Sequence, residues 1–156
     1  MSWKETLTVR AWALRNVFLL FFVKPRVLEI SDDRCEIVIP LTWRTRRHDI
    51  RAMYLGAMCM GADVAGGLIA FRLVTRTKAP VSFVFKDIRG EFFKRAEGDV
   101  HFICEDGPRI RALFQRTVDS GERQEETVVV TATVPSKRGQ EPVARFALTL
   151  SLKERA

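Results

Sequence analysis

Asp63 is the only charged residue between Arg51 and Arg72, in a stretch that is otherwise almost entirely apolar. A carboxylate in such surroundings needs hydrogen-bond partners or water, because its pKa otherwise rises. A carboxylate of this kind can act as a general base or as a nucleophile. The sequence leaves both roles open for Asp63.

Small residues surround this carboxylate if the stretch is helical. Residues three, four and seven positions apart share one face of a helix. On the face of Asp63 these include Gly56, Cys59, Met60, Gly67 and Ala70, and most of them are small. The space beside the carboxylate suits a ligand, but the same small residues could simply fit the helix against a sheet.

Gly56 lies two helical turns before Asp63, about 10 Å along the same face. The first turn of a helix presents unpaired N–H groups and the positive end of its dipole. A glycine there lets a substrate oxygen approach the backbone closely. An acyl-thioester carbonyl at this end would find oxyanion donors, with Asp63 placed deeper to activate water.

The element that must position these residues is a predicted helix over Ala52–Val74. It is apolar on every side, which indicates burial in a core or in a membrane. The strands predicted downstream are Val81–Ile88, Asp99–Cys104, Glu126–Val134 and Val143–Leu152. A helix embedded among so many strands is expected to be a core helix, and Asp63 would be costly in lipid. We therefore expect no membrane span.

The remaining pattern predicts two further helices and two earlier strands. An amphipathic helix over Leu7–Phe22 ends at Lys24-Pro25, and we expect its apolar face to cover the fold rather than contact a membrane. That face comprises Leu7, Ala11, Leu14, Phe18, Phe21 and Phe22. Arg34–Leu41 alternates as a strand that could pair with Val27–Ile30, and Pro108–Val118 is predicted to be a short helix.

These elements predict an α+β domain in which an antiparallel sheet wraps around one buried helix. Residues 1–156 are expected to form a single domain, with residues 1–24 as a helix packed on it. The last strand should direct one alternating set to the core: Ala144, Phe146, Leu148, Leu150 and Leu152.

Composition narrows the partners without selecting one. The chain has 26 basic and 19 acidic residues, and the net charge of +7 favours nucleic acid, anionic lipid or a phosphorylated cofactor such as coenzyme A. Three dispersed cysteines and two histidines offer no metal-ligand pattern, so no metal is expected. Reduced thiols are typical of a cytoplasmic protein.

The run YLGAMCMGADVAGG resembles the central helix of the PaaI-like acyl-CoA thioesterases of the hotdog superfamily. In that helix His-Gly-Gly precedes an alanine-rich stretch and then an acid. Setting Asp63 on the acid places Tyr54, Leu55 and Gly56 on His-Gly-Gly. The run VSFVFKDIRGEFFKRAEGDVHF resembles the next two strands. The resemblance covers nearly the whole chain and is closest to an uncharacterised hotdog branch beside the PaaI-like enzymes.

The resemblance implies a hotdog fold and hydrolysis of an acyl-CoA or related thioester, with coenzyme A entering as part of the substrate and no other cofactor required. Asp63 would be the base or nucleophile and Gly56 an oxyanion donor, while Tyr54 could donate a hydrogen bond but not act as a base. The expected substrate-binding residues are Arg47, His48, Cys59, Met60, Gly67 and Lys86. The resemblance also implies a homodimer or a dimer of dimers, with the acid of one protomer facing the oxyanion donors of the other.

The chain departs from the family at Tyr54, which replaces a histidine, and at Leu55, which replaces a glycine. A non-catalytic acyl-binding protein is therefore the second hypothesis. A dehydratase is weaker, because those hotdog enzymes pair a histidine with the acid. A nucleic-acid-binding module is weakest, since no motif of interleaved aromatic and basic residues supports it.

Overall fold

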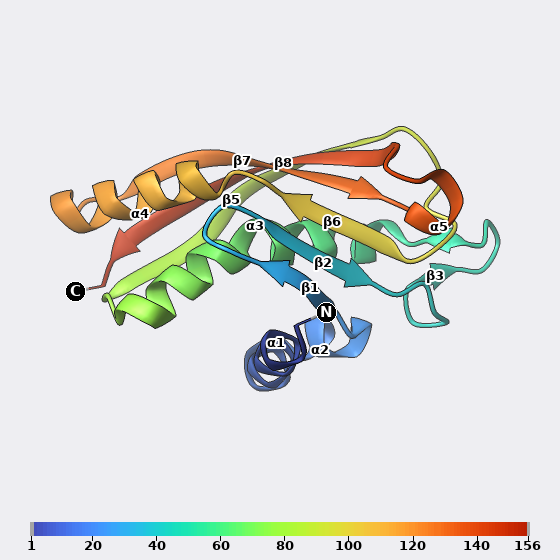
Figure 1. The fold of residues 1–156 in the computed structure, drawn as a ribbon, viewed down its shortest axis with the longest axis horizontal. Helices are drawn as coiled ribbons and strands as arrows, with labels where there is room; N and C mark the ends of the chain where they lie inside the picture. Colours follow the sequence, from blue (N-terminus) through green and yellow to red (C-terminus); the bar gives the residue numbers. More distant parts are fainter. Residues whose placement is uncertain (1, 156) are drawn as a thin grey trace.

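The computed structural model describes residues 2–155 as a curved six-stranded antiparallel sheet around a 23-residue helix, α3 (Leu55–Thr77) (Figure 1). The strands lie in the order β1-β2-β6-β7-β8-β5. Their bounds are β1 (Arg26–Ile30), β2 (Cys35–Ile39), β5 (Val81–Phe92), β6 (Val100–Cys104), β7 (Gln124–Thr133) and β8 (Pro142–Glu154). The predicted α+β arrangement, with the sheet wrapped around the apolar helix, is confirmed.

The core lies between the concave face of the sheet and α3. Strand β8 contributes the alternating set predicted for it, and Phe146, Leu148, Leu150 and Leu152 are all buried. Helix α3 is long and apolar enough to cross a membrane, but 67% of its most apolar window is buried inside the protein. Its interpretation as a core helix is therefore confirmed.

Helix α3 begins three residues later than predicted. Ala52–Met53 forms the short strand β4, which pairs with β3 (Arg46–Arg47). Two backbone bonds hold this entry: the Met53 N–H donates to the carbonyl of Ala96 and the Tyr54 N–H to that of Thr45. Tyr54 is consequently the residue preceding the helix, with extended backbone angles.

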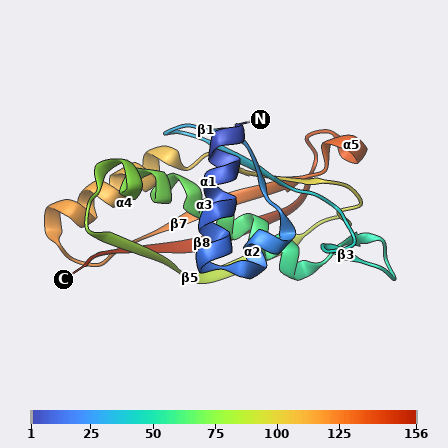
Figure 2. The same ribbon diagram turned by 90° about the horizontal axis from the view of Figure 1, so that it is seen from below.

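The N-terminal segment forms two helices instead of one. Helices α1 (Trp3–Asn16) and α2 (Phe18–Val23) are separated at Val17, whose backbone leaves the helical region with φ −143° and ψ 81°. Figure 2 shows α1 crossing α3 on the side of α3 away from the sheet. This layer covers the side of the core helix that the sheet leaves open.

The predicted orientation of this N-terminal segment is wrong. The buried residues of α1 are Thr6, Val9 and Ala13, whereas Leu7 and Leu14 are exposed. The Thr6 hydroxyl accepts a hydrogen bond from the N–H of Val27 in β1 at 2.9 Å, and Ala13 is fully buried. Small side chains on this face allow a close approach that the larger leucines would prevent.

Strand β5 extends four residues beyond the predicted end and lies at one edge of the sheet. It pairs only with β8, and the register shifts between Phe85 and Asp87, leaving Lys86 as an extra residue. Such a bulge reverses which residues face the core. Odd-numbered Phe83 and Phe85 lie opposite core leucines before it, and even-numbered Ile88 does so after it.

Two helices complete the fold. Helix α4 (Gly107–Ser120) has Pro108 in its first turn, as predicted, and ends at Gly121, whose φ of +67° places it in the left-handed region. The four-residue α5 (Pro135–Arg138) was not predicted from the sequence.

The cysteines are free thiols, and two of them lie opposite each other. Cys35 in β2 and Cys104 in β6 are register partners and are fully buried, while Cys59 in α3 is partly exposed. Burial raises the pKa of the Cys104 thiol to about 11 and also raises that of Cys35. Both thiols are therefore protonated near neutral pH.

Candidate functional site

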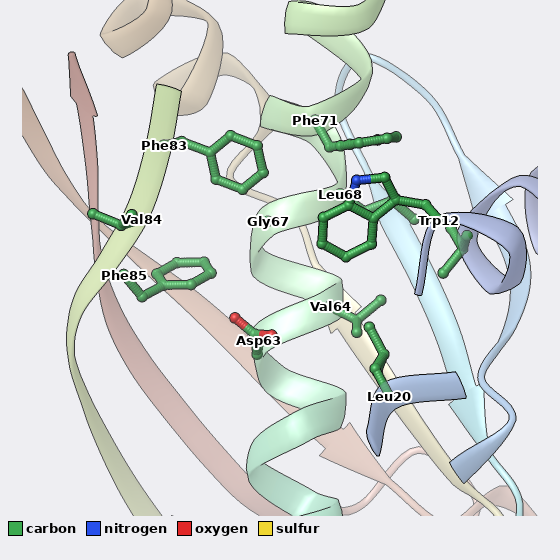
Figure 3. Close-up of a pocket in the computed structure, with 11 residues that line it drawn as sticks. Trp12, Leu20, Asp63, Val64, Gly67, Leu68, Phe71, Phe83, Val84 and Phe85 are labelled. Atoms are coloured by element: carbon green, nitrogen blue, oxygen red, sulfur yellow. The ribbon is translucent and has the colours of Figure 1, made fainter. Parts of the chain in front are cut away.

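A largely apolar hollow lies between α3, β5 and the N-terminal helices, and Asp63 stands at one end of it (Figure 3). The hollow measures about 170 Å³. An apolar cavity of about 150 Å³ is enough to bind benzene, so this space can take an aromatic group or a short aliphatic segment. The residues that line it are Val9, Trp12, Leu20, Asp63, Val64, Gly67, Leu68, Phe71, Phe83, Val84 and Phe85.

Aromatic side chains from three elements form the walls of this hollow. Trp12 of α1 meets Phe71 of α3 edge to face, with 5.7 Å between ring centroids. Phe83 and Phe85 close the β5 side (Figure 3). Gly67 makes this closure possible, because a Cβ at that position would already lie 3.3 Å from the ring of Phe85.

The carboxylate of Asp63 has no hydrogen-bond or ion-pair partner among residues 2–155. Asp63 is exposed through the opening of the hollow, but the apolar side chains that flank its carboxylate displace part of its water. This desolvation raises the pKa of Asp63, and no nearby cation offsets the effect. The group is thus a more basic carboxylate than an ordinary surface aspartate.

A second, more open hollow meets the first at Asp63. It is lined by Cys59, Met60, Asp63, Phe85, Lys86, Asp87, Ile88 and Leu148. The structure therefore brings together five residues predicted from the sequence, since Cys59, Met60 and Lys86 lie here and Gly67 in the first hollow. Lys86 forms an ion pair with Glu125 at 2.7 Å.

The other predicted residues lie at the N-terminal end of α3. Arg47 and Tyr54 line a separate hollow with Phe92 and Lys94, while His48 is exposed and lines neither of the Asp63 hollows. Arg47 donates two hydrogen bonds to the carboxylate of Asp49, at 2.9 and 2.8 Å. Within one protomer, these residues therefore do not line either of the hollows that meet at Asp63.

Gly56 retains the features of an oxyanion site. Within the described chain, no acceptor faces the N–H groups of Leu55, Gly56 and Ala57, and no side chain caps the helix. The ring of Tyr54 lies against Gly56, where a Cβ would come within 2.5 Å of its Cε1 atom. Because Tyr54 is mostly exposed, its ring can move when a ligand approaches these donors.

The sequence interpretation missed the apolar walls of the hollow. Phe83 and Phe85 carry a signal, because their alternation in VSFVF shows that both rings share one face of a strand. Trp12 and Leu20 carry none, since the pattern of their helix favoured its other face. The chain places them beside Asp63 only through the crossing of α1 over α3.

Comparison with known families gives an unambiguous assignment. The family described as a domain of unknown function, DUF4442, matches residues 11–152. The chain belongs to the DUF4442 family. This match begins within α1 and ends within β8, and it includes every element between them. No curated protein sequence gives a significant match to this DUF4442 chain.

Solved structures share the fold of this DUF4442 protein. A Pseudomonas aeruginosa protein of unknown function, described as a probable thioesterase, superposes with a TM-score of 0.76 at 21% identity, covering 96% of both chains. A protein of unknown function from Chlorobaculum tepidum gives a TM-score of 0.82 at 10% identity over 97% of this chain and 95% of that one. A Haemophilus influenzae thioesterase gives 0.66 at 14% identity over 90% and 86%. The hotdog fold expected from the resemblance is confirmed.

Proposed function

We propose that this DUF4442 protein hydrolyses an acyl-CoA or a related acyl thioester, with Asp63 as the reacting carboxylate. The observation that carries the proposal is the position of Asp63 where an apolar hollow meets an open one, without a partner and with a raised pKa. A thioester has the matching parts: an apolar acyl chain, a reactive carbonyl and a polar thiol group.

Two chemical routes are compatible with this arrangement. As a general base, Asp63 removes a proton from water while the water oxygen attacks the thioester carbonyl, and the thiol leaves with that proton. As a nucleophile, Asp63 forms an acyl anhydride and releases the thiolate, and water then hydrolyses the anhydride. Either route places negative charge on the carbonyl oxygen, which needs N–H donors.

The residues that line each hollow indicate which end of the substrate it would hold. We assign the acyl group to the space between Trp12, Phe71 and Phe85, which offers apolar walls. The pantetheine arm would leave through the open hollow past Lys86. Coenzyme A is then part of the substrate, and no further cofactor is required. The buried free thiols support a reducing compartment, so we propose a cytoplasmic location.

A homodimer would complete this site. Strand β5 is a 12-residue edge strand with exposed Ile88 and Phe92, and such an edge readily pairs with another chain. Antiparallel pairing of two copies about the middle of β5 sets the Phe92 end of one against the Phe85 end of the other. Because Tyr54 shares a hollow with Phe92, the N-terminal end of one α3 would approach Asp63 of the second copy.

Basic side chains near that end provide a place for the phosphates of coenzyme A. Arg47, Lys94 and Arg95 line the hollow at Tyr54, and guanidinium groups bind phosphate in bidentate fashion. Arg47 would exchange its bond to Asp49 for the phosphate, while Lys94 already pairs with Glu141. His48 lies in the same exposed turn as Arg47.

The decisive experiment measures thiol release from short, medium, long and aromatic acyl-CoAs by the wild type and by Asp63→Asn. We expect the substitution to remove most of the hydrolysis while the fold is retained. Asp119→Asn is the matched control, because Asp119 is an exposed aspartate on α4 that bonds only Gln115. Absence of release by the wild type across the whole panel would refute hydrolysis.

Non-catalytic acyl binding is the second candidate, and Tyr54 and Leu55 favour it because they replace the His-Gly of the PaaI-like thioesterases that the chain resembles. It predicts saturable calorimetric binding of an acyl-CoA without turnover. Binding that Gly67→Phe abolishes, with no thiol release, would select this candidate. A protein that neither binds nor hydrolyses an acyl-CoA would contradict both candidates.

A further inference from the structure

The outward face of the N-terminal helices carries several large apolar side chains that are mostly exposed. Trp3, Leu7 and Leu14 share one face of α1, and Phe18 begins α2 directly after the break at Val17; all four are 52–65% exposed. Leu19 in α2 adds to them at 62%. Single exposed apolar residues are ordinary, but a continuous stripe of large ones marks an interaction surface.

The loop before β3 extends the apolar surface of the N-terminal helices through Trp43. The rings of Phe22 in α2 and Trp43 in the loop meet edge to face at 5.8 Å between centroids. The guanidinium of Arg44 lies over both rings, 5.5 Å from the Phe22 centroid and 4.9 Å from that of Trp43. We call residues 2–25 and 41–51 together the N-terminal apolar surface. Two of the chain's three tryptophans, Trp3 and Trp43, are each 65% exposed on it, while Trp12 lines the hollow on the inner side.

Positive charge is concentrated in the same two segments. Each contains four basic residues and one acidic residue, so together they hold six of the chain's seven net positive charges. Within residues 2–155 most of these cations form no ion pair, namely Lys4, Arg10, Arg15, Lys24, Arg44, Arg46 and Arg51. Arg10 is committed to the carbonyls of Lys24 and Pro25, but the remaining six are free to meet anionic groups.

We propose that the N-terminal apolar surface binds an anionic lipid bilayer, with α1 and α2 lying in its interface. Exposed leucine and phenylalanine side chains would enter the acyl region, tryptophans would lie at headgroup level, and lysine and arginine would contact lipid phosphates. The helices, of 14 and 6 residues, are too short to cross the hydrocarbon core. The protein therefore lies on the membrane and does not span it.

The positive charge of the N-terminal apolar surface favours a bilayer over a second copy of the chain as its binding partner. Two copies joined through this surface would bring two sets of unpaired cations together, which is unfavourable. A bilayer rich in anionic lipid instead attracts each nearby Lys or Arg by about 1 kcal/mol. The β5 edge, by contrast, has exposed apolar residues on a strand with unpaired backbone groups, which suits a protein partner.

The inner side of the same helices connects the proposed membrane-binding surface to the Asp63 site. Val9, Trp12 and Leu20 line the apolar hollow that ends at Asp63, so the wall of the hollow belongs to the elements that would rest on lipid. If the proposed function holds, a long acyl chain in the bilayer has a short route to the carboxylate. Membrane binding itself does not depend on catalysis.

The test is co-flotation of the purified full chain with vesicles, at about 0.15 M salt. Vesicles of phosphatidylglycerol and phosphatidylcholine in equal parts are compared with vesicles of phosphatidylcholine alone. We expect at least tenfold stronger partitioning onto the anionic vesicles, together with a blue shift of tryptophan emission. Leu7→Glu/Phe18→Glu should reduce the partition coefficient at least tenfold.

Ala112→Glu/Val118→Glu is the matched control, because it adds the same charge at exposed positions of α4, on the other side of the molecule (Figure 1). It should bind vesicles within twofold of the wild type. Leu7→Ser/Phe18→Ser replaces the first variant if circular dichroism shows that the glutamates unfold α1.

Three results would overturn the proposal: no association of the wild type with anionic vesicles, equal binding by the stripe variants, or loss of binding in the control. A wild-type oligomer that the stripe variants dissociate, without vesicle binding, would identify a second copy as the occupant. Acyl-CoA hydrolysis by the same preparations is measured separately, so failure of either proposal leaves the other testable.

Discussion

Gly61 is a position where the central helix packs directly against a ring of the sheet. A Cβ at this residue would lie 2.2 Å from Cε2 and 2.3 Å from Cζ of Phe102 in β6, far inside ordinary contact. Phe102 is fully buried and cannot turn aside into solvent. Gly61→Ala therefore forces α3, and with it Asp63 two residues later, away from the sheet.

The expected magnitude follows from two opposing effects. Overpacking of a filled core typically costs about 1–3 kcal/mol. Alanine is favoured over glycine within a helix by about 0.5–1 kcal/mol. We expect a net loss of about 1–2 kcal/mol in the free energy of unfolding. For a chain of this length that corresponds to a decrease in Tm of about 3–8 °C.

Gly66→Ala is the matched comparison on the same helix. A Cβ there would lie 3.4 Å from Phe85 and 3.5 Å from Val128 and Val130, which is ordinary van der Waals contact. The propensity gain should prevail, so this variant should be more stable than the wild type by up to about 1 kcal/mol. The same substitution is thus expected to have opposite signs at two buried glycines.

Urea unfolding followed by circular dichroism measures both variants, and a third measurement tests the cause. Phe102→Leu shortens the ring side chain, so Gly61→Ala should cost less in that background than in the wild type. Wild-type stability for Gly61→Ala, or an additive double variant, would refute the argument from the Gly61–Phe102 contact.

Further predictions concern the titration of Asp63, the thiols and the β5 edge. Since the folded-state pKa of Asp63 is raised, its ionised form disfavours folding, and Asp63→Asn should stabilise the protein at pH 7. In urea titrations this gain in the free energy of unfolding should shrink as the pH is lowered towards 4. A gain that does not change with pH would contradict the prediction. Cys59 should react first with a thiol reagent at pH 8, whereas Cys35 and Cys104 should react only when the protein unfolds. Mass spectrometry identifies the labelled cysteines, and simultaneous labelling of all three in the folded protein would contradict this order. Ile88→Glu should shift the sedimentation coefficient from that of a dimer to that of a monomer, whereas an unchanged dimer would place the interface elsewhere.

The sequence interpretation of the N-terminal helices was wrong because two apolar stripes compete there. Leu7, Leu14 and Phe18 form the larger stripe, and periodicity alone assigns that one to the core. The structure buries Val9 and Ala13 instead, on the same side of α1 as Thr6, whose hydroxyl accepts a hydrogen bond from the N–H of Val27 in β1. Which of two faces is buried depends on the shape of the surface that receives the helix.

The local pattern determined much of the fold. The long apolar run with one carboxylate identified the core helix, and alternation in the last strand identified the face that meets it. Both signals are local in the sequence: a helix that is apolar on every side is a buried one, and a strand that alternates has one buried face. Asp63 could be selected as the reactive candidate for the same reason, since a single charge in an apolar run stands out without any knowledge of its surroundings.

The surroundings of that carboxylate were decided only by the tertiary structure. Trp12, Asp63 and Phe85 are far apart in the chain and meet because α1 crosses α3 while β5 returns along it. The bulge at Lys86, which changes the face of β5 beside Asp63, depends on pairing with β8 and leaves no periodic signature. A sequence records which side chains prefer burial, but the space between three elements exists only after they have packed.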